Sequence, residues 1–199
     1  MRIEIRSDSV VLDGYVNVTG KDSKLIPSLK GKFIEQIEPK AFTRSLERRD
    51  NVDLLLNHDK NRKLGSTKEG NLELFEDGVG LRAICTVYDA DVIDKAKNKQ
   101  LRGWSFGFFS EKDRWEDTDK GYQRRFIEDL NVFEVSIIDN TKIPAYVGTS
   151  IEMRDNKEIL LENRNFESEI RVVDSSKKEE HREKIDYSKY YDVIKKLER

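Results

Sequence analysis

Residues 103–109 read GWSFGFF, a short segment in which aromatic and small side chains alternate. In a β-strand, successive side chains point to opposite faces, so the segment predicts one aromatic face and one mostly small face. The two faces would consist of Trp104, Phe106 and Phe108, and of Ser105, Gly107 and Phe109. Three aromatic rings can anchor the strand in a core, and the small side chains opposite them predict an open patch around the Ser105 hydroxyl. The alternative is a serine beside a glycine where another backbone segment packs closely.

Strand signals continue on both sides of this segment. Apolar side chains alternate through residues 10–18, where Gly14 predicts a bulge. Turn signals at residues 68–71 and 76–80 separate further strands, and LNVFEVSII at residues 130–138 predicts another. The region therefore resembles a meander of short strands.

Two segments carry helical spacing instead. EPKAFTRSLERRD predicts a short amphipathic helix whose first position is Pro39. DADVIDKAKNKQL predicts a second helix, with Asp89 or Asp91 as its cap and Gly103 at its end. A few helices among many strands predict an α+β fold that is mainly β.

Beyond about residue 150 the apolar pattern thins into a segment of mixed charge. Apolar residues such as Ile159 and Leu160 predict short helices there, whereas the run SSKKEEHREK has little to bury and is typical of a linker. We therefore expect one domain over residues 1–150 and a charged, partly helical C-terminal extension over residues 151–199.

The composition limits the classes of protein to consider. The chain has 199 residues, of which 36% are hydrophobic and 38% charged, and its net charge is −2. That length suits one main domain, and a nearly neutral charge gives no overall attraction to nucleic acid or anionic membranes. A single cysteine excludes an internal disulfide framework. The start MRIEIRSDSV lacks a signal-peptide pattern and no stretch reaches the roughly 20 apolar residues of a membrane helix, so we expect folding in the cytoplasm.

The Ser105 hydroxyl directs attention to the histidines. A serine hydroxyl is a poor nucleophile at neutral pH and needs a neighbouring base, most often histidine. The chain has 2 histidines: His58 follows the apolar run DLLLN, and His181 lies in the charged extension. Because a strand end holds a side chain accurately beside a cleft, His58 is the candidate base. The alternative is an ordinary loop histidine in a charged neighbourhood.

A histidine base usually needs a third group that orients the imidazole and stabilises its charged form. With no second histidine in the predicted domain, that group would be a carboxylate. Glu134 shares strand parity with apolar neighbours in residues 130–138, and a buried carboxylate costs several kcal/mol unless it is paired. Glu134 therefore calls for a partner, either the imidazole or a structural Lys or Arg. Asp129 and Asp139, nearer the strand ends, are alternative acids.

Other chemically active residues fit less well. Cys85 shares a face with Leu81 and Val87, which predicts a core thiol. No His and Cys cluster has zinc-ligand spacing, and no glycine-rich loop precedes a helix in a phosphate-binding pattern, so neither a metal nor another cofactor is expected. Arg124 or Arg125 could assist an oxyanion, although spacing alone gives no geometry for that role.

Four segments together resemble one family, the prohead proteases of tailed bacteriophages, which are capsid maturation serine proteases. They stand in family order across roughly residues 10–150: GKFIEQIEPKAFTRSL, LLLNHDKNRKLGSTKEGNLELFEDGVGLRAICTV, LRGWSFGFF and LNVFEVSIIDNTKIPAYVGT. Each segment is a weak signal alone, and the order makes the match specific. Trp104 departs from the small or aliphatic residue expected before the family's serine, although strand parity directs it to the core.

The resemblance implies a fold and a set of roles. The family is similar in fold to the herpesvirus assemblins, which implies an assemblin-like β-barrel with a few surrounding helices. The family's nucleophile falls on Ser105, its histidine on His58, and the acid of its glutamate-valine-serine strand on Glu134. Assemblins use a second histidine as the third member, and its absence here favours a carboxylate.

The same resemblance implies a serine endopeptidase that needs no cofactor. Its expected partners and substrates are the major capsid protein with its scaffolding segment and the protease itself, inside the assembling prohead in the host cytoplasm. A homodimer is a further expectation, and neither nucleic acid nor membrane is an expected partner. Two other hypotheses remain: a catalytically inactive assembly protein that keeps the fold and binds capsid or scaffold chains, and a hydrolase of small esters.

Overall fold

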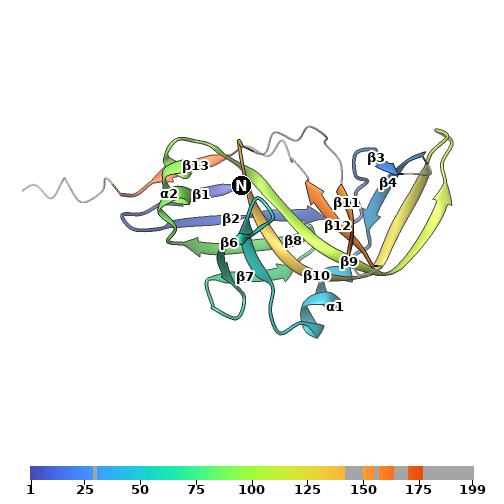
Figure 1. Cartoon of the computed structure of the whole chain (residues 1–199), viewed down its shortest axis with the longest axis horizontal. Coiled ribbons are helices and arrows are strands. Elements are labelled where there is room, and N and C mark those ends of the chain that lie inside the picture. The colour runs from blue at the N-terminus through green and yellow to red at the C-terminus, as the bar shows by residue number, and fades with distance from the viewer. Residues whose placement is uncertain (29–30, 142–149, 155–156, 164–169, 177–199) are drawn as a thin grey trace, which may run out of the picture.

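The computed structural model describes residues 1–28, 31–141, 150–154, 157–163 and 170–176, and it is mainly β (Figure 1). The strands are β1 (Arg2–Ile5), β2 (Val10–Val18), β3 (Ile26–Ser28), β4 (Gly31–Ile37), β5 (Asp53–Leu56), β6 (Asp59–Ser66), β7 (Leu72–Glu76), β8 (Gly80–Val87), β9 (Leu101–Asp117), β10 (Gln123–Asp139), β11 (Ser150–Arg154), β12 (Lys157–Asn163) and β13 (Arg171–Asp174). The helices are α1 (Ala41–Arg48) and α2 (Ala90–Lys97). The predicted α+β class with mostly β structure is confirmed.

The strands form two sheets. One has five strands in the order β13-β1-β2-β8-β7. The other has eight strands, with the order β11-β12-β9-β10-β4-β3, and β5 and β6 join it through pairing of β5 with β10. The centre of the larger sheet is the antiparallel hairpin of β9 and β10, in which each strand has 17 residues. This curved hairpin reaches from the region of α2 to the far end beside β3 and β4 (Figure 1).

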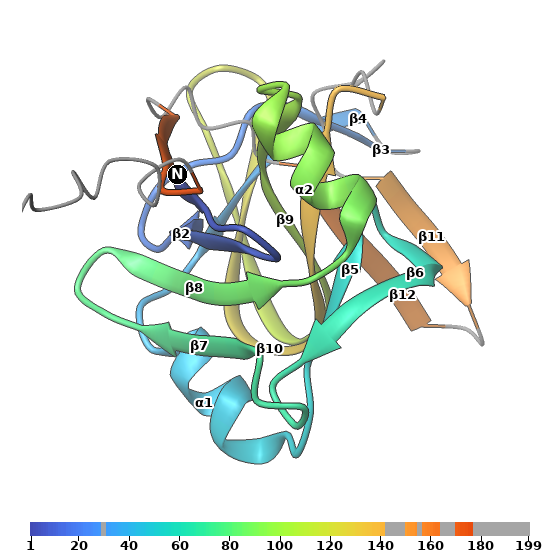
Figure 2. The same ribbon diagram turned by 90° about the vertical axis from the view of Figure 1, so that its left-hand side faces the viewer.

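One hydrophobic core joins the two sheets, because apolar side chains from both belong to the same buried cluster. The alternation predicted for residues 103–109 is confirmed on its aromatic face, where Trp104, Phe106 and Phe108 are buried. The rings of Phe106 and Phe108 stack with centroids 5.3 Å apart. Figure 2 shows α2 above this core and α1 below it; α1 contacts β7 and β10, whereas α2 contacts β1 and β2.

Strand β10 pairs in parallel with two different strands, and this positions the candidate site. The first part of β10 lies beside β4, with Gln123 opposite Phe33 and Ile127 opposite Ile37. The later part lies beside β5, with Glu134 opposite Asp53. Because parallel neighbours run in the same direction, β5 delivers the chain end at His58 to the same end of the sheet as the end of β10.

The two helices form where helical spacing predicted them, with different ends. Helix α1 begins at Ala41 rather than at Pro39, and the carboxylate of Glu76 from β7 accepts hydrogen bonds from the backbone N–H groups of Lys40 and Thr43. A negative side chain at this position satisfies otherwise unpaired N–H groups at the helix start. Helix α2 has Asp89, one of the two predicted candidates, as its cap.

The predicted end of α2 at Gly103 is wrong. The helix ends at Lys97, and Gly103 lies within β9, which begins at Leu101. The apolar side chain of Leu101 satisfied the helical spacing, but it is buried as part of the strand. Short apolar periodicity does not separate the last turn of a helix from the first residue of a following strand.

The glycine predicted to mark a bulge in β2 lies close to one. The register between β2 and β8 shifts between Tyr15 and Asn17, directly after Gly14. Gly14 also makes room for the indole of Trp104, because a Cβ atom at position 14 would lie 3.0 Å from Trp104 Nε1. The bulky residue at position 104 is therefore accommodated in the core by a glycine from the opposite sheet.

The segment after residue 150 contributes strands to both sheets. Strand β12 pairs antiparallel with β9, and β13 pairs in parallel with β1. The short helix predicted around Ile159 and Leu160 is wrong, because both residues lie in β12. Residues 177–199, which include His181, lie outside the described residues, and the domain boundary at residue 150 stays an expectation. No helix in the described part of the chain is long and apolar enough to cross a membrane.

Candidate active site

His58 lies on the two-residue turn that connects β5 to β6. Leu56 pairs with Asp59, and the two residues between them, Asn57 and His58, have φ angles of 57° and 60°. Positive φ at both central residues is typical of a type I′ hairpin turn, in which asparagine and glycine are the usual residues. Histidine in the left-handed region costs on the order of 1 kcal/mol or more, so contacts elsewhere must hold this turn.

The end of β10 provides those contacts. The backbone N–H of Asn57 donates to Ile137 O at 2.9 Å, and the backbone N–H of His58 donates to Ser136 Oγ at 3.1 Å. In the other direction, the backbone N–H of Asp139 donates to Asn57 Oδ1 at 3.1 Å. Three hydrogen bonds from one strand therefore fix both residues of the turn.

The three sequence-predicted site residues come together at this turn. His58 Nε2 lies 2.8 Å from Ser105 Oγ, and His58 Nδ1 lies 2.6 Å from Glu134 Oε1. Ser105 stands on β9 and Glu134 on the neighbouring strand β10. The imidazole thus lies between a hydroxyl and a carboxylate, each within hydrogen-bond distance of a different ring nitrogen.

Glycine at position 107 is required by this arrangement. A Cβ atom there would lie 2.7 Å from Glu134 Oε1 and 2.6 Å from Phe133 Cζ. The register of β9 and β10 shifts between Val132 and Glu134, so Phe133 occupies a bulge opposite Gly107. Gly107 has no side chain, which leaves space beside Ser105. The carboxylate of Glu134 and the ring of Phe133 fill that space.

The predicted open patch around Ser105 is wrong for the same reason. Ser105 is fully buried, Glu134 is 3% exposed, and the side chain of His58 is 13% exposed. The backbone of β12 also pairs along β9, with Asn163 opposite Ser105. The hydroxyl thus lies in a closed site in which His58 is the most exposed of the three groups.

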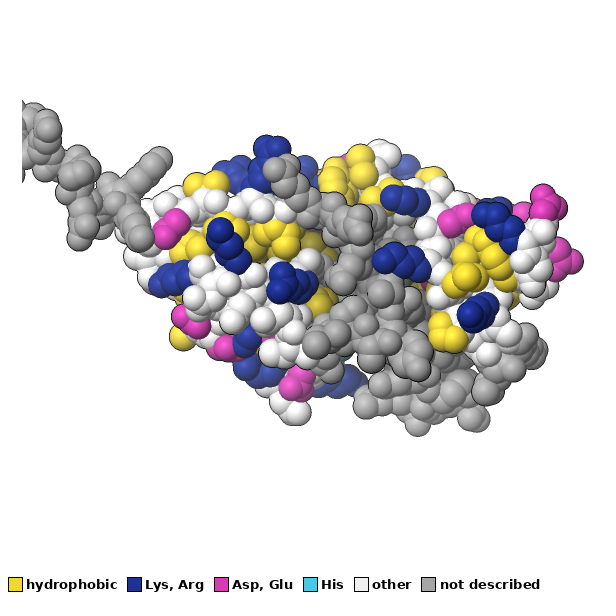
Figure 3. All heavy atoms as spheres, turned by 90° about the horizontal axis from the view of Figure 1, so that it is seen from above, with side chains coloured by type: hydrophobic (Ala, Val, Ile, Leu, Met, Phe, Trp, Pro, Cys, Tyr) yellow, Lys and Arg dark blue, Asp and Glu magenta, His cyan; other side chains and the backbone are white. Residues whose placement is uncertain are grey.

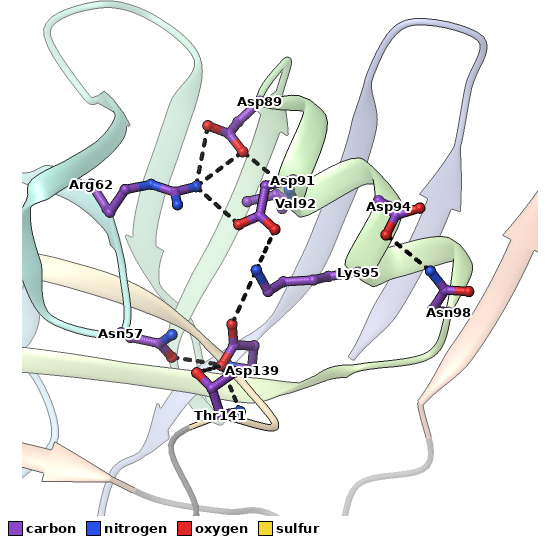
Figure 4. A network of polar contacts seen from close by, with 10 residues as sticks. All are labelled: Asn57, Arg62, Asp89, Asp91, Val92, Asp94, Lys95, Asn98, Asp139 and Thr141. Carbon is purple, nitrogen blue, oxygen red and sulfur yellow. Dashed lines mark hydrogen bonds and ion pairs between the residues drawn. The ribbon is translucent and has the colours of Figure 1, made fainter.

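A polar network extends from the turn to α2 (Figure 4). Asp139, which is buried, accepts from the backbone and hydroxyl of Thr141 and lies 3.6 Å from Lys95 Nζ. Lys95 also pairs with Asp91, and Asp91 accepts from Arg62 on β6 at 3.1 Å. This network connects the β5–β6 hairpin to α2 at two points, because Asn57 belongs to its turn and Arg62 to β6.

The alternative acids have other partners. Asp129 receives two hydrogen bonds from the guanidinium of Arg48, at 2.7 and 2.9 Å, and these hold the pKa of Asp129 below its ordinary value. Asp139 contacts the turn through its own backbone and belongs to the network with Lys95. Glu134 is the carboxylate that meets the imidazole of His58.

The arginines considered for an oxyanion lie elsewhere. Arg124 and Arg125 are in the first part of β10, beside β4, whereas Glu134 is in the part beside β5. Arg124 pairs with Asp22, and Arg125 pairs with Asp113. Neither arginine therefore belongs to the site around Ser105.

Cys85 is a core thiol, as predicted. It is 2% exposed, and burial raises the pKa of its thiol to about 12. A thiol in that state stays protonated and is a poor nucleophile at neutral pH. Among the described residues, no group of three or more His, Cys, Asp or Glu side chains could hold a metal ion.

Two residues at the site were missed by reasoning from the sequence. Ser136 Oγ donates to Glu134 Oε2 at 2.6 Å, and Asn57 occupies the first position of the turn. A signal for each was present: Ser136 is two residues beyond Glu134 on the same strand parity, and asparagine is a preferred residue of type I′ turns. Ser136 comes close to His58, and Asn57 to the end of β10, because β5 pairs with β10. That pairing cannot be predicted from either segment alone.

The arrangement supports one kind of chemistry directly. An imidazole with Nδ1 on a carboxylate and Nε2 on a hydroxyl can accept the hydroxyl proton while the carboxylate stabilises the resulting imidazolium. The hydroxyl oxygen then becomes a nucleophile for an acyl carbon.

Comparison with known proteins identifies the family of the chain. A family model described as the caudovirus prohead serine protease matches residues 1–162. Neither the search of curated proteins nor the search of solved structures gave a match. Because the matched region covers most of the 199 residues, the chain belongs to the caudovirus prohead serine protease family, a family of capsid maturation proteases.

Proposed function

We propose that the protein is a serine endopeptidase in which Ser105 is the nucleophile, His58 the general base and Glu134 the group that orients His58. The observation that supports this proposal most strongly is the continuous pair of contacts, 2.8 Å from Ser105 Oγ to His58 Nε2 and 2.6 Å from His58 Nδ1 to Glu134 Oε1. Membership of a serine protease family supports the same reaction.

The proposed mechanism has two acyl-transfer steps. His58 Nε2 takes the proton of Ser105 as the hydroxyl oxygen attacks the peptide carbonyl carbon, and it then gives that proton to the departing amine. Water attacks the resulting ester with His58 again as the base, which releases the acid product and restores Ser105. Backbone N–H groups near Ser105 would stabilise the oxyanion, an effect worth about 3 to 4 kcal/mol per donor in known acyl-transfer sites.

The proposed substrates are the scaffolding segment of the major capsid protein and the protease itself, cut inside the prohead in the host cytoplasm. Family membership supports a role in capsid maturation, and these particular targets are our inference from it. We also propose an assemblin-like relation for the fold, which the mainly β architecture with one long curved hairpin supports. A homodimer belongs to the same proposal.

Substrate entry requires a local rearrangement, because Ser105 is fully buried. The backbone of β12 pairs with β9 at Ser105, so an extended peptide that reaches the hydroxyl along this edge has to replace β12. Leu161→Pro removes a backbone N–H from β12 and weakens its pairing. We expect it to increase the rate of precursor cleavage, whereas Val172→Pro in β13, on the other sheet, does not; a slower rate for Leu161→Pro would contradict this route of entry.

The experiment that tests the function is co-expression of the full chain with the capsid precursor. We expect a trimmed precursor with the natural chain, no trimming with Ser105→Ala, and normal trimming with Ser110→Ala, which removes a hydroxyl from the same strand. A product pattern unaffected by Ser105→Ala would overturn the proposal and favour the catalytically inactive assembly protein. Cleavage of small esters with an intact precursor would favour an esterase instead.

A further inference from the structure

Ser136 makes two contacts that connect the acid of the site to the base. Its hydroxyl oxygen lies 2.6 Å from Glu134 Oε2 and 3.1 Å from the backbone nitrogen of His58. The residue is fully buried and lies on β10 directly opposite Ser105. The two oxygens of Glu134 are thereby divided, with Oε1 on the imidazole and Oε2 on Ser136.

The directions of these hydrogen bonds follow from the chemistry of the groups. A backbone N–H can only donate, and an ionised carboxylate can only accept. The Ser136 hydroxyl therefore donates its hydrogen to Glu134 and accepts from the backbone of His58. One hydroxyl thus fixes the position of the carboxylate relative to the peptide group that carries the imidazole.

This link matters because both groups have freedom that would impair a base. The terminal torsion of a glutamate is broad, so a carboxylate with a single hydrogen bond can rotate about its Cγ–Cδ bond. A neutral imidazole has two tautomers, and only the one with hydrogen on Nδ1 leaves Nε2 free to accept the proton of Ser105. His58 also needs support in its left-handed backbone conformation.

We propose that Ser136 is a positioning residue that holds Glu134 and the turn at His58 in register, and so maintains the imidazole with its hydrogen on Nδ1. Its effect on rate rests on the proposed function, since Ser136 would act through His58 rather than on the substrate. Its effect on the imidazole does not require any reaction and can be measured in the resting protein.

Ser45 provides a matched control for the rate. Ser45 is a buried serine on α1, and its hydroxyl accepts a hydrogen bond from the backbone N–H of Val132 on β10 at 2.9 Å. Ser45→Ala and Ser136→Ala therefore each remove a buried hydroxyl that accepts a hydrogen bond from a backbone N–H, that of Val132 and that of His58 respectively. We expect similar losses of thermal stability, while Ser136→Ala alone lowers kcat by roughly 10- to 100-fold with little change in KM.

Nuclear magnetic resonance of the imidazole gives the second measurement. The chain has 2 histidines, so His181→Gln in the full chain leaves His58 as the single imidazole, and labelling with ¹⁵N-histidine reports its two nitrogens separately. At a pH where the ring is neutral, we expect hydrogen on Nδ1 only. Adding Ser136→Ala should give a mixture of both tautomers, and adding Ser45→Ala should not.

The outcomes separate this inference from the proposed function. If Ser105→Ala abolishes cleavage while Ser136→Ala changes neither kcat nor the tautomer, the positioning role is wrong and the peptidase stands. If Ser105→Ala leaves the product pattern unchanged, the peptidase is wrong, and the tautomer of His58 with and without Ser136 still decides the positioning role. A single Nδ1–H tautomer in the Ser136→Ala protein would overturn the inference in either case.

Discussion

The two ends of the β9–β10 hairpin bury polar groups in different ways. At the end near β5, Ser105, Glu134 and Ser136 are buried and form hydrogen bonds with His58. At the end near β4, Arg125 is buried beside Asp113 and Glu35, with Arg125 Nη1 3.6 Å from Glu35 Oε2. The guanidinium of Arg125 also lies over the ring of Trp115, 5.5 Å from its centroid, and Figure 3 shows hydrophobic and charged side chains together on this end of the molecule.

The difference shows which buried charges can do chemistry. A guanidinium keeps its proton at all ordinary pH values and only donates hydrogen bonds, so the Arg125 side chain can stabilise the fold but cannot act as a base. An imidazole both accepts and donates, so the group around His58 can move a proton from a hydroxyl. Burial of ionisable groups is common to both ends, whereas at the end near β5 a group that both accepts and donates protons, the imidazole of His58, lies beside a hydroxyl.

Exchange of one glutamate at each end is the strongest test of this comparison. Glu134→Gln leaves the shape intact but favours the wrong tautomer of His58, so we expect kcat/KM for precursor cleavage to fall by roughly 10⁴-fold. Glu35→Gln changes a carboxylate that is equally buried, and we expect cleavage within a few-fold of the natural protein together with a lower melting temperature. Equal losses of activity in the two variants would remove the distinction between the two ends.

Addition of one methyl group near the site should have the next largest effect. Gly107→Ala forces a Cβ atom against Glu134 and Phe133, so we expect activity to fall on the order of 10²-fold and the free energy of unfolding to fall by about 1 to 3 kcal/mol. Gly78→Ala, in the turn between β7 and β8, meets no atom within 4 Å and serves as the control. Kinetics and chemical denaturation measure both effects, and normal activity in Gly107→Ala would contradict the close packing of the carboxylate.

The network behind the turn predicts a smaller effect that depends on pH. Burial raises the pKa of Asp139, but hydrogen bonds from Thr141 and Asn57 and the charge of Lys95 outweigh burial and lower the pKa below its ordinary value. A depressed carboxyl pKa stabilises the fold above the unfolded value near 4 and loses that contribution as the pH falls through the folded value. We therefore expect Asp139→Asn to be less stable than the natural protein at neutral pH, with a difference that shrinks below about pH 4.

Thermal unfolding across this pH range measures the difference. Asp94→Asn, which removes an exposed carboxylate from the same helix that supplies Lys95, controls for the loss of one negative charge. A difference between Asp139→Asn and the natural protein that grows with acidity would show that Asp139 destabilises the fold instead.

The smallest expected effect concerns the five-stranded sheet. Because burial raises the pKa of Cys85 to about 12, we expect iodoacetamide at neutral pH to leave both the thiol and precursor cleavage unchanged. A serine-directed reagent should stop cleavage under the same conditions. If iodoacetamide inactivated the folded protein, Cys85 rather than Ser105 would become the candidate nucleophile.

Local alternation predicted much of this molecule. The aromatic face of residues 103–109, the core position of Cys85 and a cap at Asp89 or Asp91 each follow from neighbouring residues; the structure agrees with the first two and has Asp89 as the cap. The need of Glu134 for a partner followed from the cost of a buried carboxylate, and His58 lies beside it. These predictions succeeded because each depends on a few consecutive positions.

The failures share a different cause. The closed state of Ser105 depends on Phe133 in a bulge of β10, on Glu134 beside Gly107 and on β12 along β9, none of which is local to Ser105. The strand at Ile159 forms because β9 offers an edge, which overrides a weak helical pattern. Register, bulges and edge pairing depend on contacts among several strands of the sheet. The sequence of one segment is therefore not enough to predict them.

Parallel pairing of β5 with β10 affects when the site forms during folding. His58 and Glu134 are 76 positions apart in the sequence, and parallel strands cannot close through a tight turn. Contacts of such long range form after local hairpins during folding. A nascent or half-folded chain therefore lacks the assembled trio of Ser105, His58 and Glu134, so the proposed peptidase activity would arise only once β5 has paired with β10.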